Sequence, residues 1–156
     1  MQLLADLHPL VVHFPVALFI VYALTEIIGI VNKSDKMLFT AHYLLLLGVV
    51  TAVGAVLTGN QAGEAAKLAA GTIGNYEELI ESHETFATIT LWFFLFVLIF
   101  RTYLVLKKKF VGRIRYLFIL FAIIGSILII ETGYRGGELV FIHRIGTGIL
   151  QNVPSN

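Results

Sequence analysis

The sequence contains no cysteine and little charge. Without cysteine the chain cannot form disulfides, iron–sulfur clusters, thiolate zinc sites or the covalent haem linkage that requires a C-x-x-C-H motif. Charged residues make up only 13% of the chain and the net charge is +1. The basic residues sit beside apolar stretches and form no patch interleaved with polar and aromatic residues, so we expect no nucleic-acid partner.

Motifs for hydrolytic chemistry are also missing. The sequence has no nucleophile elbow, no phosphate-binding glycine loop and no serine with an obvious base. We therefore assign no catalytic residue, and the pattern favours an electron-transfer or binding protein over a stand-alone enzyme.

Four hydrophobic stretches account for most of the chain, and 58% of its 156 residues are hydrophobic. A soluble domain of this length cannot bury so much apolar surface, whereas a membrane protein has no such limit. Each stretch approaches or exceeds the length of about 20 residues that a membrane-spanning helix needs. No convincing internal repeat is evident. We predict an all-α integral membrane four-helix bundle, a single domain (1–156) with spans over about 9–31, 38–58, 84–106 and 115–132.

The distribution of lysine and arginine predicts the orientation of the bundle. Eight of the 11 basic residues, Arg101 among them, fall after the first span or in the connection between the third and fourth spans. Only Lys67, Arg135 and Arg144 fall on the opposite side. The positive-inside rule therefore places both short connections in the cytoplasm. Both termini, an interfacial loop over 61–82 and the C-terminal tail are expected at the extracytoplasmic face.

Four of the five histidines map to this extracytoplasmic end. They are His8, His13, His83 and His143, whereas His42 maps to the opposite end. Scattered interfacial histidines would be expected at both faces, so the clustering indicates a bound metal or haem. For any one of these histidines, a purely structural hydrogen bond remains the alternative.

The segment 8–15, HPLVVHFP, is the most unusual in the chain. Pro9 suits the first turn of a helix, and Pro15 removes a second backbone donor, so we expect a distorted first turn. His13 lies about 7 Å deeper than His8 at 1.5 Å per residue. Polar groups at that depth are costly unless they are satisfied, so His13 is expected to face the bundle interior.

The other two histidines lie at predicted helix ends. His83 opens the third span after Ser82, a residue type that often caps a helix. His143 follows the glycines that end the fourth span. Gly136 and Gly137 would permit a chain reversal, which would bring His143 back over the mouth of the bundle.

Haem b fits these residues with the fewest assumptions, because it needs only one or two axial imidazoles from separate helices and an apolar slot. His13 and His83 are the predicted axial pair, and His8 and His143 are second choices. A copper or zinc site remains an alternative, although short ligand spacings such as HExxH are missing.

Other residues could complete such a site. Arg135 and Arg144 lie at the same mouth and could pair with haem propionates. Small residues of the second span, including Gly48 and Gly59, would admit a neighbouring helix or a flat ligand. Near the outer end of the fourth span, Glu131 could orient one of the imidazoles.

Glu26 is a second carboxylate within the spans, in the predicted cytoplasmic half of the first one. Intramembrane carboxylates are functional candidates by default. Burial also allows a purely structural role, in which Glu26 is neutral and hydrogen-bonded.

At this point the residues resemble a known group. The segment HPLVVHFPVAL (8–18) resembles the HPxxVHFPIAL signature of a bacterial family of small four-span membrane proteins catalogued as a domain of unknown function. Thr58-Gly59 and His83 follow in the expected order, and TGYRGGELVFIHRIGTG (132–148) resembles the family's TGxxGGxLVYxHGxG ending. Phe141 and Arg144 depart from that ending, where the family has tyrosine and glycine.

The resemblance implies a bacterial inner-membrane location. Some members of the family are joined to or encoded beside cytochrome-type domains, which points toward haem and respiratory electron transfer. The matching positions in this chain are His8, His13, His83 and His143.

The sequence therefore predicts a membrane b-type haem protein acting in electron transfer at the extracytoplasmic face. Its expected surroundings are the lipid bilayer and a redox partner protein or larger membrane complex, and it could form a homo-oligomer. Two alternatives remain open: a copper- or zinc-binding membrane protein facing the periplasm, and a cofactor-free structural subunit of a larger complex.

Overall fold

The computed structural model describes residues 2–70 and 76–142, and helices dominate this part of the chain. Four segments are long and apolar enough to cross a membrane, the first of them formed by α1 and α2 together. The predicted all-α, four-span architecture is confirmed. The elements are α1 (Gln2–Val11), α2 (His13–Val31), α3 (Asp35–Ala70), α4 (Tyr76–Leu106) and α5 (Ile114–Phe141).

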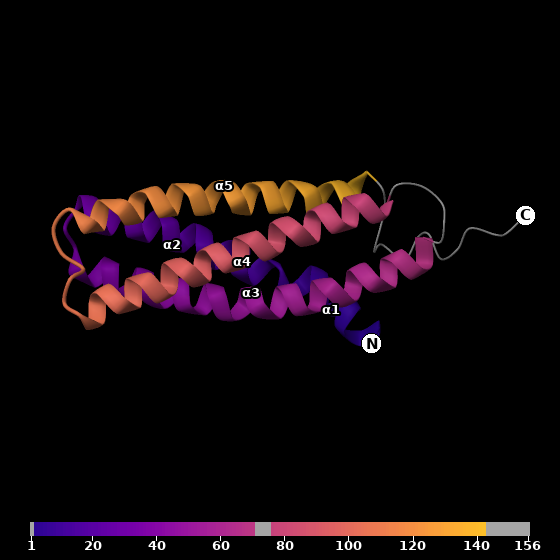
Figure 1. Ribbon diagram of the computed structural model, residues 1–156, viewed down its shortest axis with the longest axis horizontal. Coiled ribbons are helices and arrows are strands. Elements are labelled where there is room, and N and C mark those ends of the chain that lie inside the picture. Colours follow the sequence, from indigo (N-terminus) through magenta and orange to yellow (C-terminus); the bar gives the residue numbers. More distant parts are fainter. Residues whose placement is uncertain (1, 71–75, 143–156) are drawn as a thin grey trace, which may run out of the picture.

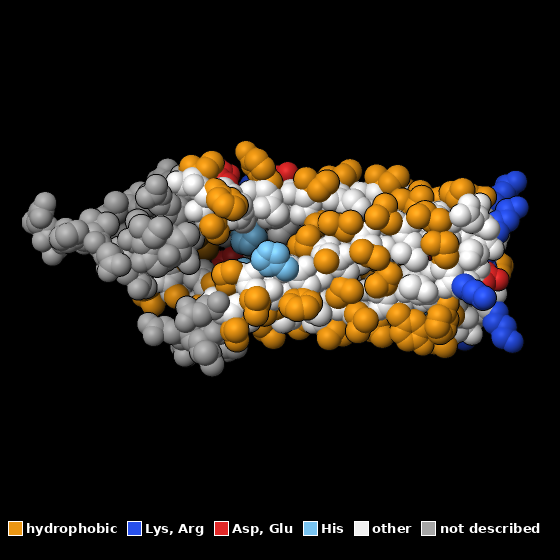
Figure 2. Space-filling model, turned by 180° about the vertical axis from the view of Figure 1, so that it is seen from behind, with side chains coloured by type: hydrophobic (Ala, Val, Ile, Leu, Met, Phe, Trp, Pro, Cys, Tyr) orange, Lys and Arg blue, Asp and Glu red, His pale blue; other side chains and the backbone are white. Residues whose placement is uncertain are grey.

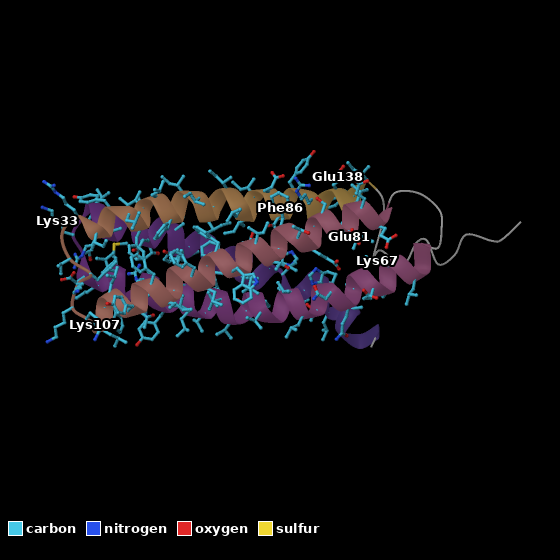
Figure 3. The ribbon with its side chains drawn as sticks, in the orientation of Figure 1. Lys33, Lys67, Glu81, Phe86, Lys107 and Glu138 are labelled. Atoms are coloured by element: carbon cyan, nitrogen blue, oxygen red, sulfur yellow. The ribbon has the colours of Figure 1, made fainter. Side chains whose placement is uncertain are left out.

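The helices form an elongated bundle in which α2 and α4 each pack against both α3 and α5 (Figure 1). The connections 32–34 and 107–113 lie together at one end, which we call the lysine end because Lys33 and Lys107 mark it (Figure 3). The opposite end carries Lys67, Glu81 and Glu138 (Figure 3). We call it the histidine end, because α1, the start of α2 and the first turns of α4 bring His8, His13 and His83 there.

The outer surface of the bundle is apolar along most of its length, and lysine and arginine concentrate at one end (Figure 2). Large hydrophobic side chains point outward from every span; Trp92 on α4, for example, is 64% exposed. In water such a surface would be unfavourable, whereas in a bilayer it contacts lipid tails. The exposed apolar belt therefore supports a membrane location.

Three helices extend beyond the predicted spans. α3 continues past Gly59 to Ala70, α4 begins at Tyr76, before Ser82, and α5 runs through its glycines to Phe141. A glycine inside a helix costs only about 1 kcal/mol, which packing against a neighbouring helix can offset. The predicted chain reversal at Gly136 and Gly137 is therefore also wrong, and most of the predicted interfacial loop is helical.

The predicted distortion near the first span's start is confirmed as a break at Val12, between α1 and α2. Pro15 has no N–H to donate to the carbonyl of Val11, and the next bond, from Val16 N to Val12 O, is long at 3.4 Å. The sequence had suggested that Pro9 lies in the first turn of a helix. In the structure it lies farther along, inside α1. On both sides of the break, α1 and α2 pack against α3.

The structure shows an internal two-fold relation that we did not find in the sequence. The α1–α2–α3 hairpin corresponds to the α4–α5 hairpin, and equivalent residues of the first helix of each hairpin meet across the bundle axis. Phe19 stacks on Phe94 with ring centroids 3.7 Å apart, and Glu26 pairs with Arg101. Both pairs are 75 residues apart in sequence (94 − 19 and 101 − 26).

Glycines repeat in the same way on the second helix of each hairpin. Gly48 of α3 lies against Phe19, and Gly125 of α5 lies against Phe94. At both positions a methyl group would come within 2.7 Å of the ring, so the close approach of the stacked pair requires glycine. The two halves thus use the same device to bring an aromatic pair onto the axis.

Candidate ligand site at the histidine end

His8 of α1 lies half-buried against α3. Its Nδ1 is 3.2 Å from the hydroxyl oxygen of Thr58. That hydroxyl already donates to the backbone carbonyls of Gly54 and Ala55, at 3.0 Å each. Since the hydroxyl proton is engaged, the imidazole must be the donor. His8 therefore carries its proton on Nδ1 and keeps the lone pair on Nε2.

His83 of α4 is held in an equivalent way against α5. Its Nδ1 lies 3.2 Å from the backbone carbonyl oxygen of Thr132. A carbonyl can only accept, so Nδ1 of His83 also carries the proton. Within the described part of the chain, no hydrogen bond engages Nε2 of either histidine. Both rings thus present the form in which histidine binds metals.

The two imidazoles belong to equivalent positions of the internal repeat, since His83 follows His8 by 75 residues (83 − 8). They are close enough that a charge on one would repel a charge on the other. Each ring also rests on a glycine: Gly59 of α3 beneath His8, and Gly136 of α5 beneath His83. The two histidines are therefore a third pair of equivalent residues, after the phenylalanine pair and the ion pair.

Alanine at either glycine is expected to displace an imidazole. The added methyl carbon would lie 2.9 Å from Cε1 of His8 in Gly59→Ala and 3.0 Å from Cε1 of His83 in Gly136→Ala. Nitrogen NMR of histidine-labelled protein in micelles should show the signal of that ring shifting, and overpacking should cost about 1–3 kcal/mol of stability. Gly133→Ala is the control, because its methyl group would meet nothing within 4 Å. Unchanged signals in both test variants would contradict the packing described.

The structure does not support the predicted orientation of His13. Its side chain is exposed on the outside of the bundle, whereas His8 is half-buried. Five positions along a helix of 3.6 residues per turn correspond to a rotation of about 140°, so the two side chains cannot both face inward. The prediction that His13 faces the bundle interior was wrong. His143 and Arg144 lie outside the described residues.

Arg135 of α5 is tied to α4 and to its own helix. It donates to the hydroxyl of Ser82 and to Glu131, the latter at 2.7 Å, and lies 4.0 Å above the ring of Phe86. Its Nε atom is buried and has no partner among the described residues. Glu131 thus binds an arginine in this structure, where the sequence had suggested an imidazole. Ser82 lies inside α4, where it accepts from Arg135 and does not cap the helix.

A groove of about 530 Å³ runs between α3 and α4 at the same end. It is polar and contains three carboxylates but no imidazole, and Lys67 pairs with two of them, Glu81 and Glu84. Across residues 2–70 and 76–142, no group of three or more histidine, aspartate or glutamate side chains could hold a metal ion. The groove's lining residues are Asn60, Glu64, Glu81, Glu84, Thr85, Thr88 and Ile89.

The buried ion pair between Glu26 and Arg101 is the feature that the sequence reasoning missed. Their side chains are 0% and 1% exposed, and Arg101 also donates to the backbone carbonyl of Leu38 at 2.7 Å. Phe110 lies beneath the guanidinium, 4.6 Å away. Arg101 had been counted with the cytoplasmic connection, which was wrong. The sequence did contain a signal for this pairing: positions 8, 19 and 26 are separated by 11 and 7 residues, and positions 83, 94 and 101 have the same spacings.

Comparison with known proteins agrees with the resemblance noted above. No curated protein and no solved structure matches this chain. A family model described as a predicted membrane protein (DUF2231) matches residues 5–148, which include His8 and His83. The chain therefore belongs to the DUF2231 family of predicted membrane proteins.

Proposed function

We propose that this protein binds haem b at the histidine end, with His8 and His83 as axial ligands, and that it acts in electron transfer. The observation that carries the proposal is the shared state of the two imidazoles. They come from separate helices and from equivalent positions of the repeat, and each has Nδ1 engaged with a protein acceptor and Nε2 without a hydrogen bond to a described residue. The pair replaces the sequence prediction of His13 and His83.

Other features of this end suit haem. Gly59 and Gly136 remove side-chain bulk beside the two rings, which lets each imidazole lie close to the helix that it packs against. The buried Nε of Arg135 is a donor without a partner among the described residues, and a propionate could accept from it. The carboxylate-lined groove between α3 and α4 would repel propionates, so the proposal does not depend on it.

The ligand set favours electron transfer over catalysis. Haem supplies one-electron chemistry, and two protein imidazoles would fill both axial positions, which leaves no coordination site for a substrate. Without Arg101, seven basic residues remain at the lysine end against three (8 − 1 = 7). The positive-inside rule thus still favours a histidine end on the extracytoplasmic side of a bacterial inner membrane, where a redox partner protein could exchange electrons with it.

An absorption spectrum of the detergent-purified protein, oxidised and dithionite-reduced, tests the proposal. We expect a Soret band and sharp reduced α and β bands, with a pyridine haemochrome assay identifying haem b. Folded protein from cells with ample haem that shows none of these bands would overturn the proposal. Metal analysis of the same sample would then separate the alternatives. Bound copper or zinc would indicate a metal-handling protein, and no metal would indicate a structural subunit.

A further inference from the structure

A second cavity opens on the lipid-facing side of the bundle at the lysine end. It is an apolar crevice of about 480 Å³ between α3 and α4. The crevice opens toward the outer surface, since its lining residues Ile99 and Leu106 are 61% and 76% exposed. The lining residues are His42, Leu46, Leu98, Ile99, Thr102, Tyr103 and Leu106.

His42 contributes a buried polar atom to this crevice that lacks a partner among the described residues. Its Nδ1 atom is buried and makes no hydrogen bond to any described residue. The neighbouring hydroxyl of Thr102 is already engaged, because it donates to the backbone carbonyl of Leu98 at 2.8 Å. A buried polar atom without a partner costs about 1–3 kcal/mol, so a group from outside the chain is needed to satisfy His42.

Positive charge adjoins the crevice directly. Leu106, the last residue of α4 and of the crevice lining, is followed by Lys107, Lys108 and Lys109. All three lysines are exposed, and none forms an ion pair with a described residue. By contrast, Arg115 in the first turn of α5 pairs with Asp35. The three lysines are therefore free to bind an anion.

We propose that this crevice binds an anionic phospholipid. The acyl chain would lie against Leu46 and Leu98, an ester carbonyl would accept a hydrogen bond from His42, and the phosphate would meet Lys107–Lys109. His42 is seven residues into α3, about 10 Å from its start at 1.5 Å per residue. From the bundle interior toward the lysine end, the crevice thus offers apolar surface, then a buried donor, then basic residues. A phospholipid presents its acyl chain, its ester and its phosphate in the same order. This proposal is independent of haem binding.

The test is lipid titration of the purified protein followed by native mass spectrometry. Phosphatidylglycerol is compared with phosphatidylcholine of the same acyl chains. The variant Lys107→Gln/Lys108→Gln removes two charges beside the crevice. The control Lys33→Gln/Lys36→Gln removes two charges at the same end, one from the connection 32–34 and one from the first turn of α3. Ile99→Trp fills the crevice without changing charge, and circular dichroism checks that each variant is folded.

We expect the wild type to bind phosphatidylglycerol at least about tenfold more tightly than phosphatidylcholine. Lys107→Gln/Lys108→Gln should lose most of that preference, and Lys33→Gln/Lys36→Gln should retain it. Ile99→Trp should weaken binding of the first phosphatidylglycerol. Equal affinity for the two lipids, equal losses in the two lysine variants, or undiminished binding by folded Ile99→Trp would each overturn the proposal.

Discussion

Replacing Glu26 with leucine is expected to lower the free energy of unfolding by about 3–5 kcal/mol, because Arg101 would be left buried without a counter-charge. The loss should be large since both side chains are at most 1% exposed. Unfolding in mixed micelles with increasing dodecyl sulfate, followed by circular dichroism, measures it.

Removing the arginine instead of the glutamate is expected to lower the free energy of unfolding by a smaller amount. In Arg101→Met the remaining Glu26 can take up a proton and become neutral, whereas a guanidinium cannot lose its charge. The double variant Glu26→Leu/Arg101→Met should recover most of the stability lost in Glu26→Leu, since it removes both buried charges.

Glu131→Leu provides a matched control. It breaks the ion pair with Arg135, in which the two side chains are 41% and 32% exposed, so a loss below about 1 kcal/mol is expected. If Glu26→Leu were no more costly than Glu131→Leu, the buried pair would not contribute as we describe.

His8→Ala and His83→Ala are each expected to abolish low-spin haem binding, with haem affinity falling at least about tenfold. Each substitution would remove one axial ligand and leave a hydrogen-bond acceptor of the neighbouring helix without its donor. Reduced-minus-oxidised spectra and haem content per protein measure the effect.

His13→Ala serves as the control for this experiment. It removes the same side chain five residues away, at an exposed position, so the spectrum should match the wild type. Loss of haem in His13→Ala, with the bands of His8→Ala intact, would restore the pair predicted from the sequence and refute the one assigned from the structure.

The sequence was sufficient for the class of fold. Apolar stretches bounded by polar residues predict membrane spans because every backbone group in lipid must be paired within a helix. Pro9 and Pro15 likewise predicted a distorted first span, and the break at Val12 confirms it. Both inferences depend only on local chemistry, which the order of residues records directly.

Features that depend on contacts between distant helices could not be predicted in this way. The choice between His8 and His13 requires the rotation of α1 and α2 about their axes, which the contacts with α3 determine. Helix ends were placed at Gly59 and Gly133 because glycine often ends helices, but here both lie within longer helices. The partner of Glu26 was missed because 75 residues separate it from Arg101.

The two-fold relation between the hairpins has a consequence for how such a bundle can be made. In a homodimer of identical hairpins, each residue on the axis would meet its own copy, so glutamate would face glutamate and arginine would face arginine. Here phenylalanine faces phenylalanine, but Glu26 faces Arg101. When both hairpins are joined in one polypeptide, one pair of equivalent positions can hold two different residues while the other pairs keep the same residue in both halves. The covalent link between the halves is therefore what permits opposite charges to meet in the core between the two hairpins.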